Sequence, residues 1–310
     1  MPKAQQRNQA STNYQLFNNF FFNTKKFSKK NQDQKTTQHT FQSFKMMKAV
    51  AARIGLKKAT RPFKDFYEEW IETLKNILLP HLRRSMLVSS ANHLSTHVQM
   101  LHHHFQTYYY ALDLAASEDI SQLLYPTWRN TLEKPFLWFA DFHPNLFINL
   151  LRSFLNQQQQ DSEIIERNHE KVLKKFKTLT FPFAWNTPSD NLLSRIEQIE
   201  CGLRLMVPTF VTRARKAQGG FINKVAVDWV RCEGKQEASK VIGGAVVANM
   251  EELVSVFLDA NRLRRSILTE IMGATDVYQA ALYLEGLANF FVGFKDCELL
   301  KEFEQYKIPI

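Results

Sequence analysis

Residues 125–155, YPTWRNTLEKPFLWFADFHPNLFINLLRSFL, bring Trp and Phe side chains close together along the chain. Because such side chains bury a large apolar area, we expect this aromatic segment to lie in the protein core. Pro126, Pro135 and Pro144 interrupt the aromatic segment and exclude one continuous helix. The sequence therefore predicts a short helix before Pro135, a tight turn at residues 140–143 and a new helix from Pro144.

Charged residues lie among these aromatic side chains. Charges close to a core are generally paired, and Arg129 and Glu133 have the i,i+4 spacing of a helical ion pair. Either Asp141 or His143 can cap the helix that begins at Pro144. No spacing in this segment matches a known catalytic motif, so we interpret it as a structural core or as a docking surface.

The composition favours an all-α protein. Of the 310 residues, 45% are hydrophobic and 13% aromatic, which is enough for a large core. Alternating Val, Ile and Thr are scarce, whereas stretches rich in Leu, Glu, Lys, Gln and Ala are common. Cys201, Cys232 and Cys297 lie far apart, which argues against a disulfide framework and a structural zinc site. No uninterrupted apolar run reaches about eighteen residues, so no membrane span is expected.

The positive charge is concentrated at the N-terminus. Residues 1–60 hold twelve Lys and Arg residues but one acid, Asp33, which gives them a charge of +11. The remaining residues carry −1, so the whole formal net charge of +10 comes from residues 1–60. Their polar composition without helical or strand period predicts a disordered tail. Its clustered lysines suit an anionic membrane surface and also the phosphates of a nucleic acid. An organelle transit peptide, or a chain that starts at Met46 or Met47, would explain the same composition. The clustered lysines are Lys25, Lys26, Lys29 and Lys30.

Helical periodicity predicts one large bundle of long antiparallel helices over residues 61–300, with a short tail at residues 301–310. The clearest amphipathic helix begins at Pro62. Its apolar face contains Phe63, Phe66, Tyr67, Trp70, Leu74, Ile77 and Leu78. A polar connection is expected from residues 157–160. Further helices are expected at residues 91–116, 161–176, 237–270 and 275–300, and from residue 189 beyond Pro208.

Histidines are frequent in the helix expected at residues 91–116. The consecutive residues 102–104 point in different directions around a helix and do not converge on one ion. His93 and His97 have i,i+4 spacing, which makes them the candidate ligands for zinc or haem. Because no carboxylate or thiolate ligand is suggested nearby, hydrogen-bonded or solvated histidines are the simpler interpretation. We therefore expect no cofactor.

The sequence offers no enzyme signature. Gly243 and Gly244 are neither preceded by a strand nor followed by the GK[ST] sequence of a phosphate-binding loop. No Ser-His-Asp arrangement, HExxH motif or pair of catalytic carboxylates is defined by the spacing. We therefore predict a non-enzymatic protein.

Several of these segments resemble the plant delay-of-germination (DOG) domain, over residues 61–297. The similar segments are FKDFYEEWIETLKNIL, HVQMLHHHFQTYYYALDLA, YPTWRNTLEKPFLWFADFHPNLFINLLRSF and ANMEELVSVFLDANRLRRSILTEIMGATDVYQAALYLEGLANFFVGFKD. Within the family, residues 128–136 and 196–208 are most similar to the inaperturate-pollen proteins. The family motif corresponds here to Trp128, Arg129, Glu133, Pro135, Trp138, Asp141 and Pro144, which are the candidate core or partner-binding residues.

This resemblance implies a non-enzymatic factor that helps to position apertures on the pollen surface. It would gather at patches of the plasma membrane in developing pollen and work with protein partners, as a homo-oligomer or hetero-oligomer. The expected location is therefore the cytoplasm and the periphery of the plasma membrane.

The TGA-type bZIP transcription factors share the DOG domain, which implies an alternative function as a nuclear transcriptional co-regulator associated with DNA. Those factors carry leucine heptads ahead of the domain. In residues 1–60 the leucines are Leu16 and Leu56, so no zipper can form there.

Overall fold

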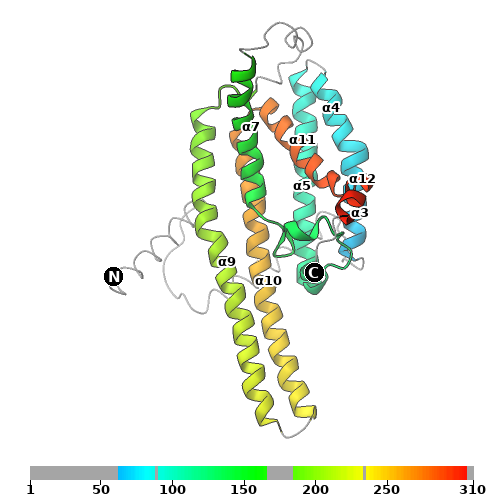
Figure 1. Cartoon of the computed structure of the whole chain (residues 1–310), viewed down its shortest axis with the longest axis vertical. Helices are drawn as coiled ribbons and strands as arrows, with labels where there is room; N and C mark the ends of the chain where they lie inside the picture. Colours follow the sequence, from blue (N-terminus) through cyan, green and yellow to red (C-terminus); the bar gives the residue numbers. More distant parts are fainter. Residues whose placement is uncertain (1–61, 88–89, 166–183, 233–234, 306–310) are drawn as a thin grey trace, which may run out of the picture.

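The computed structural model of the chain describes residues 62–87, 90–165, 184–232 and 235–305 (Figure 1). Within these residues the protein is all-α apart from one two-stranded hairpin, which confirms the predicted fold class. The tail predicted to be disordered, with Lys25, Lys26, Lys29 and Lys30, lies outside the described residues, as does most of the helix expected at residues 161–176.

The N-terminal part of the bundle consists of α3 (Phe63–Thr73), the π-helical turn η1 (Leu74–Leu78), α4 (Leu79–Leu87), α5 (Ala91–Asp119) and α6 (Ser121–Leu124). A 3-10 turn, η2 (Lys134–Phe136), leads into the strands β1 (Leu137–Trp138) and β2 (Asp141–Phe142). The C-terminal part consists of α7 (Asn145–Ile165), α9 (Asp190–Arg231), α10 (Lys235–Ala274), α11 (Val277–Gly293) and α12 (Cys297–Gln305). Helix α5 packs against α3, α4, α10 and α11.

The amphipathic helix predicted from Pro62 forms, but η1 shifts its apolar face. Ile77, which was expected on the buried face, is 49% exposed. A π-helical turn contains more residues than an α-helical turn, so the positions that follow are rotated around the helix axis. Leu79 and Leu82 take the next core positions instead. The buried residues before the shift, as predicted, include Phe63, Tyr67, Trp70 and Leu74.

Two predicted boundaries are wrong. Helix α7 continues through the glutamines at residues 157–160, where a polar connection was expected, because glutamine is a good helix former. The helix expected at residues 275–300 is divided into α11 and α12. Asp296 lies between them, and its carboxylate accepts hydrogen bonds from the backbone N–H groups of Glu298 and Leu299, at 2.9 and 3.1 Å. This N-terminal cap starts α12 as a separate helix.

Helices α9 and α10 have 42 and 40 residues and run antiparallel to each other (Figure 1). Their upper halves in that view belong to the bundle and supply buried residues such as Leu192, Ile199, Phe257 and Leu268. Their lower halves project beyond the other helices. We call this projection, residues 211–231 of α9 and 235–252 of α10, the helical arm.

One helix in the described part of the chain reaches the length and composition of a membrane span. It is Gln236–Ala274 within α10, whose apolar window has a mean hydropathy of 1.6 and is 22% buried. The expectation of no such segment rested on uninterrupted apolar runs, whereas α10 reaches this threshold through its mean hydropathy. Most of this window is not buried, although α10 supplies Val256, Phe257 and Ala260 to the core.

Candidate functional site

The aromatic segment folds into a small β-hairpin. Strands β1 and β2 pair antiparallel, with Leu137 opposite Phe142 and Trp138 opposite Asp141. Phe139 and Ala140 connect them, with φ values of 45° and 65°. Positive φ at both connecting positions is typical of tight hairpins, and asparagine or glycine usually occupies them. For other residues this left-handed conformation costs about 1 kcal/mol or more each, so the surrounding structure must hold the turn in place.

The prediction for the residues before this hairpin is wrong in part. Eight residues separate Pro126 from Pro135, too few for a stable helix, and the 3-10 turn η2 forms there instead. The helix after Pro144 is confirmed as α7. Of the two proposed caps, His143 is confirmed, because its Nδ1 accepts a hydrogen bond from the backbone N–H of Asn145 at 3.1 Å.

Arg264 of α10 holds the hairpin. Its Nε donates a hydrogen bond to the carbonyl oxygen of Phe142 at 2.8 Å, and its Nη2 donates to the carbonyl oxygens of Trp138 and Phe139, the latter at 3.2 Å. The side chain is completely buried, and burial lowers the pKa of this guanidinium despite the nearby Asp141 carboxylate. One side chain therefore binds both strands and the strained connection between them.

Arg129 lies on the other side of Asp141. Its Nη1 is 3.3 Å from Glu133 Oε2, which confirms the predicted i,i+4 ion pair, although the residues between them form turns. Its Nη2 is 3.3 Å from Asp141 Oδ1 and 3.0 Å from the hydroxyl of Tyr108. Asp141 is thus held between two arginines, and its carboxylate does not cap α7. We call Arg129, Glu133, Asp141 and Arg264 the buried ion network.

Two tyrosines add hydrogen bonds to the network. The hydroxyl of Tyr108 donates to Asp141 Oδ1 at 2.6 Å, and that of Tyr67 donates to Glu133 Oε1 at 3.4 Å. Burial, with the neighbouring carboxylates, raises the pKa of both tyrosines, which therefore remain donors. Burial disfavours the charge of Arg129, but the tyrosines and carboxylates around it outweigh burial and raise its pKa.

A second polar cluster joins α5 to α10 beside this network. Asn261 Nδ2 donates to Asp113 Oδ1 at 2.6 Å and to the carbonyl oxygen of Tyr109 at 2.9 Å. Arg265 Nη1 lies 2.9 Å from Asp113 Oδ2. Burial raises the pKa of Asp113, although Asn261 and Arg265 oppose this effect. The cluster fixes the register between the two helices.

The candidate motif residues divide into an interior group and a rim. The four charged side chains of the buried ion network are 0% exposed, so no substrate reaches them. Trp128 and Trp138 are half-buried and lie beside the guanidiniums of Arg129 and Arg264, at 4.7 and 5.5 Å from the ring centres. Pro144 is buried, whereas Pro135 is exposed. The network can hold the hairpin against α10, and its chemistry is structural.

Sequence reasoning missed Arg264, Tyr67, Tyr108 and Asn261. Arg264 lies in the buried stripe of α10 between Leu263 and Ile267. An arginine at such a position is the signal that could have identified it, because a fully buried arginine requires several acceptors. Which acceptors it finds depends on a hairpin that the sequence did not predict.

The histidine pair His93 and His97 lies on the surface of α5. The Nδ1 of His97 is 2.8 Å from the carbonyl oxygen of His93, and its ring packs against that of His81 at 5.9 Å. Across the residues that the structure describes, no three His, Cys, Asp or Glu side chains are grouped to hold a metal ion.

Comparison with known proteins identifies relatives over most of the chain. The family model described as "DOG1: Seed dormancy control" matches residues 78–153. Protein INAPERTURATE POLLEN1 of Arabidopsis thaliana is 46% identical over 266 residues, which cover 82% of this chain and 97% of that protein. The INAPERTURATE POLLEN 1 homolog of Oryza sativa subsp. japonica is 35% identical over 260 residues, which cover 81% of this chain and 92% of that protein.

Proposed function

The chain belongs to the inaperturate-pollen family of DOG-domain proteins, and on this premise we propose that it is a non-enzymatic positioning protein of pollen aperture formation. It marks regions of the plasma membrane in developing pollen and acts there through contacts with other proteins.

The extent of the similarity is the observation that carries this proposal. The match to the Arabidopsis relative covers 97% of that protein, so the two share the whole helical architecture and not one isolated motif. The names of both relatives refer to the apertures of pollen. A common role in aperture formation is the simplest consequence.

The buried ion network supports a role that does not require catalysis. Its arginines and carboxylates neutralise one another inside the protein and hold a hairpin to α10. What remains available to partners is the surface, including Phe136, which is 47% exposed, and the helical arm. A rigid helical body with exposed apolar side chains suits a scaffold.

A complementation experiment tests the proposal. The chain, fused to a fluorescent protein, is expressed in developing microspores of Arabidopsis thaliana plants that lack INAPERTURATE POLLEN1. A second fusion lacks residues 1–60, and the fluorescent protein alone is the control. We expect restored apertures and discrete patches of fluorescence at the plasma membrane before the wall is laid down.

The truncated fusion separates two ways of reaching the membrane. Patches that persist without residues 1–60 place the targeting in the helical domain, whereas their loss assigns it to the basic tail. A uniform nuclear signal in both fusions, with no restored apertures, would contradict the proposal and favour transcriptional co-regulation.

A further inference from the structure

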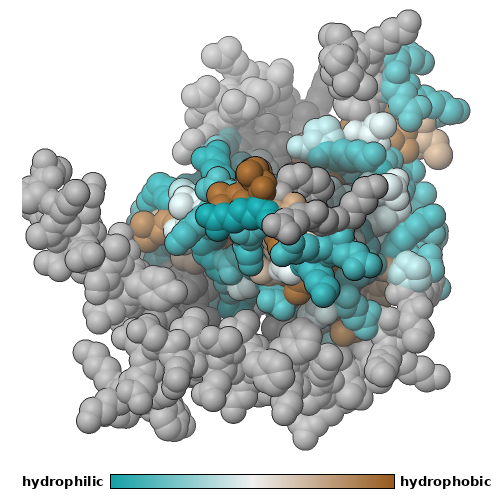
Figure 2. Space-filling view, turned by 90° about the horizontal axis from the view of Figure 1, so that it is seen from below, coloured by the Kyte–Doolittle hydropathy of each residue, from teal (hydrophilic) through white to brown (hydrophobic). Residues whose placement is uncertain are grey.

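The helical arm carries apolar side chains that the described residues do not cover. Ile222, Val227 and Val230 of α9 are 61, 51 and 85% exposed, and Val247 of α10 is 58% exposed. Between residues 211 and 231 no described side chain of α9 is buried. Figure 2 views the molecule from the end of the helical arm, where α9 ends and α10 begins. It shows hydrophobic patches between hydrophilic side chains. Exposed apolar groups with a polar surround are typical of interaction surfaces.

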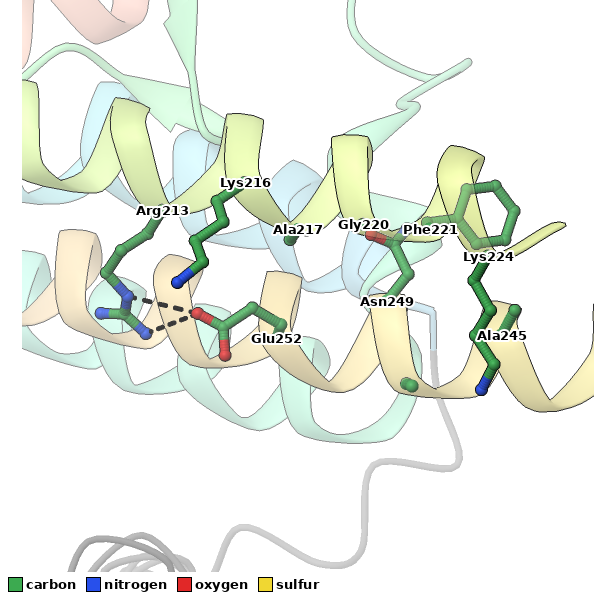
Figure 3. Close-up of a pocket in the computed structure, with 10 residues that line it drawn as sticks. Arg213, Lys216, Ala217, Gly220, Phe221, Lys224, Ala245, Asn249 and Glu252 are labelled. Atoms are coloured by element: carbon green, nitrogen blue, oxygen red, sulfur yellow. Dashed lines mark hydrogen bonds and ion pairs between the residues drawn. The ribbon is translucent and has the colours of Figure 1, made fainter. Parts of the chain in front are cut away.

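A groove of about 480 Å³ lies between α9 and α10 on this arm (Figure 3). Small residues line it, namely Ala217, Gly220, Ala245 and Ala248. A Cβ atom placed on Gly220 would meet nothing within 4 Å. Phe221 also borders the groove, but the small residues leave the space open, so the groove can accept an apolar side chain from another helix.

The groove is also positively charged. Arg213 is satisfied by Glu252, to which its Nε and Nη2 donate at 3.2 and 3.1 Å. Lys216 and Lys224 also line the groove, and neither forms an ion pair within the described part of the chain. Eight residues along a helix correspond to about 12 Å, so the two free ammonium groups are carried two turns apart. The groove therefore suits a helix that brings carboxylates as well as an apolar side chain.

Helix α12 of the same chain has these properties. Glu298, Glu302 and Glu304 oppose one basic residue, Lys301, and all four are exposed. None of the glutamates forms an ion pair with a described residue. Leu299, which follows Glu298, is 45% exposed. The helix has nine residues, or about 14 Å, and the groove from Arg213 to Lys224 extends over about 16 Å of α9.

We propose that α12 of one copy of this protein docks into the groove of the helical arm of a second copy. Leu299 enters the space lined by the small residues. Glu298 and Glu302, one turn apart on α12, pair with Lys216 and Lys224, whose long side chains span the difference between one turn and two. Figure 1 places α12 on the far side of the bundle from the lower half of α9, so the contact joins two molecules.

The charges and the shape of the groove favour this occupant over a lipid surface. A bilayer surface is flat on the scale of two helices and would leave the space between them unfilled. Two helical arms do not pair with each other in this way, because both present the same positive groove.

The contact is heterologous, since it joins different surfaces of the two molecules. Such contacts build either closed rings or open chains, and open chains extend along a surface. The inference deepens the proposed scaffold function. It rests on that function only for the role that self-association would have in the cell. The contact itself is tested in solution, so failure of either proposal can be recognised separately.

Sedimentation equilibrium of the full-length chain over a range of concentrations and salt concentrations is the test. The groove variant is K216E/K224E and the helix variant is E298K/E302K. We expect each to weaken self-association about tenfold or more, and we expect added salt to weaken that of the unmodified chain. The control R231E/K240E changes the net charge of the arm as much as the groove variant does, at exposed positions outside the groove, and is expected to assemble like the unmodified chain.

A charge-exchange variant distinguishes loss of the contact from misfolding of the variants. The chain with all four substitutions carries the same two charge pairs with reversed signs, and we expect its self-association to recover. Circular dichroism establishes that each variant retains its helix content. Unchanged assembly of the groove variant, an equal loss in the control, or no recovery in the fourfold variant would overturn the proposal. An unmodified chain that stays monomeric would also overturn it. So would a groove variant that self-associates normally and has lost only the binding to vesicles of anionic lipid.

Discussion

The Nε atom of Arg264 lies 2.8 Å from the carbonyl oxygen of Phe142, a residue 122 positions earlier in the chain. This hydrogen bond joins the middle of α10 to the end of the β-hairpin. The same guanidinium reaches the carbonyl oxygens of Trp138 and Phe139. A connection between two residues with positive φ, which is unfavourable by itself, is thus held by one arginine from another element.

Replacement of Arg264 by alanine is therefore expected to destabilise the protein strongly. The change leaves the carbonyl groups of Trp138, Phe139 and Phe142 without their donor and removes one of the two buried arginines beside Asp141. The expected loss is about 3–5 kcal/mol of unfolding free energy. Urea denaturation followed by circular dichroism measures this loss. Arg262→Ala is the matched control, because Arg262 is 43% exposed and pairs with Asp259 at the surface, and should change stability by about 1 kcal/mol or less. Equal effects of the two substitutions would show that Arg264 does not hold the hairpin.

Two glycines inside helices should respond in opposite directions to the same substitution. A Cβ atom on Gly286 of α11 would lie 3.1 Å from Phe154 Cζ, and Phe154 is stacked on Trp185 at 5.4 Å and has little room to move. A Cβ atom on Gly273 of α10 would meet nothing within 4 Å. We expect Gly286→Ala to cost about 1 kcal/mol through overpacking and Gly273→Ala to gain up to about 1 kcal/mol from helix propensity.

Thermal unfolding of the two alanine variants checks this difference. If Gly286→Ala raises the melting temperature as much as Gly273→Ala, the close approach of α7 to α11 is not as tight as the distances indicate.

The helical class and most helix positions could be predicted from the sequence, because they depend on local periodicity and on apolar faces. The pairing of Arg129 with Glu133 followed from their spacing. The hairpin at residues 137–142 could not be predicted in this way. Its turn contains Phe139 and Ala140 in place of the usual asparagine or glycine, and its stability comes from Arg264, which is distant in sequence. The groove depends on the alignment of α9 with α10, which periodicity does not determine.

Trp138 and Trp70 provide a comparison between the rim and the interior. A fully buried Trp138 would lose about 3–5 kcal/mol on replacement by alanine, but this side chain is half-buried, so we expect about 2 kcal/mol. Trp70 is 3% exposed and packs against Phe105 and Phe291, so Trp70→Ala should show the full loss of about 3–5 kcal/mol. Chemical denaturation of both variants gives the two values. A loss at Trp138 as large as that at Trp70 would assign Trp138 to the core, and loss of partner binding without loss of stability would identify it as a docking residue.

The stability of the protein should fall on mild acidification because of its half-buried histidines. Burial lowers the pKa of His102, His104 and His143 in the folded state. The unfolded chain therefore binds more protons than the folded protein once the pH falls below the ordinary histidine pKa of about 6.5. The stability that these residues contribute is present above that pH and is lost as the pH falls through the lowered folded-state values.

Replacement of His104 by glutamine tests this assignment. Its ring stacks on Trp70 at 4.8 Å, and its Nε2 is 3.0 Å from the carbonyl oxygen of Trp70, so protonation must be accommodated inside the contact between α3 and α5. Melting temperatures measured from about pH 7.5 to about pH 5 should decline less steeply for His104→Gln than for the unmodified protein, because one of the groups that binds protons on unfolding has been removed. His93→Gln, at an exposed position of the same helix, should leave the slope unchanged. If His104→Gln keeps the full slope, the acid sensitivity arises elsewhere and the burial of His104 has no part in it.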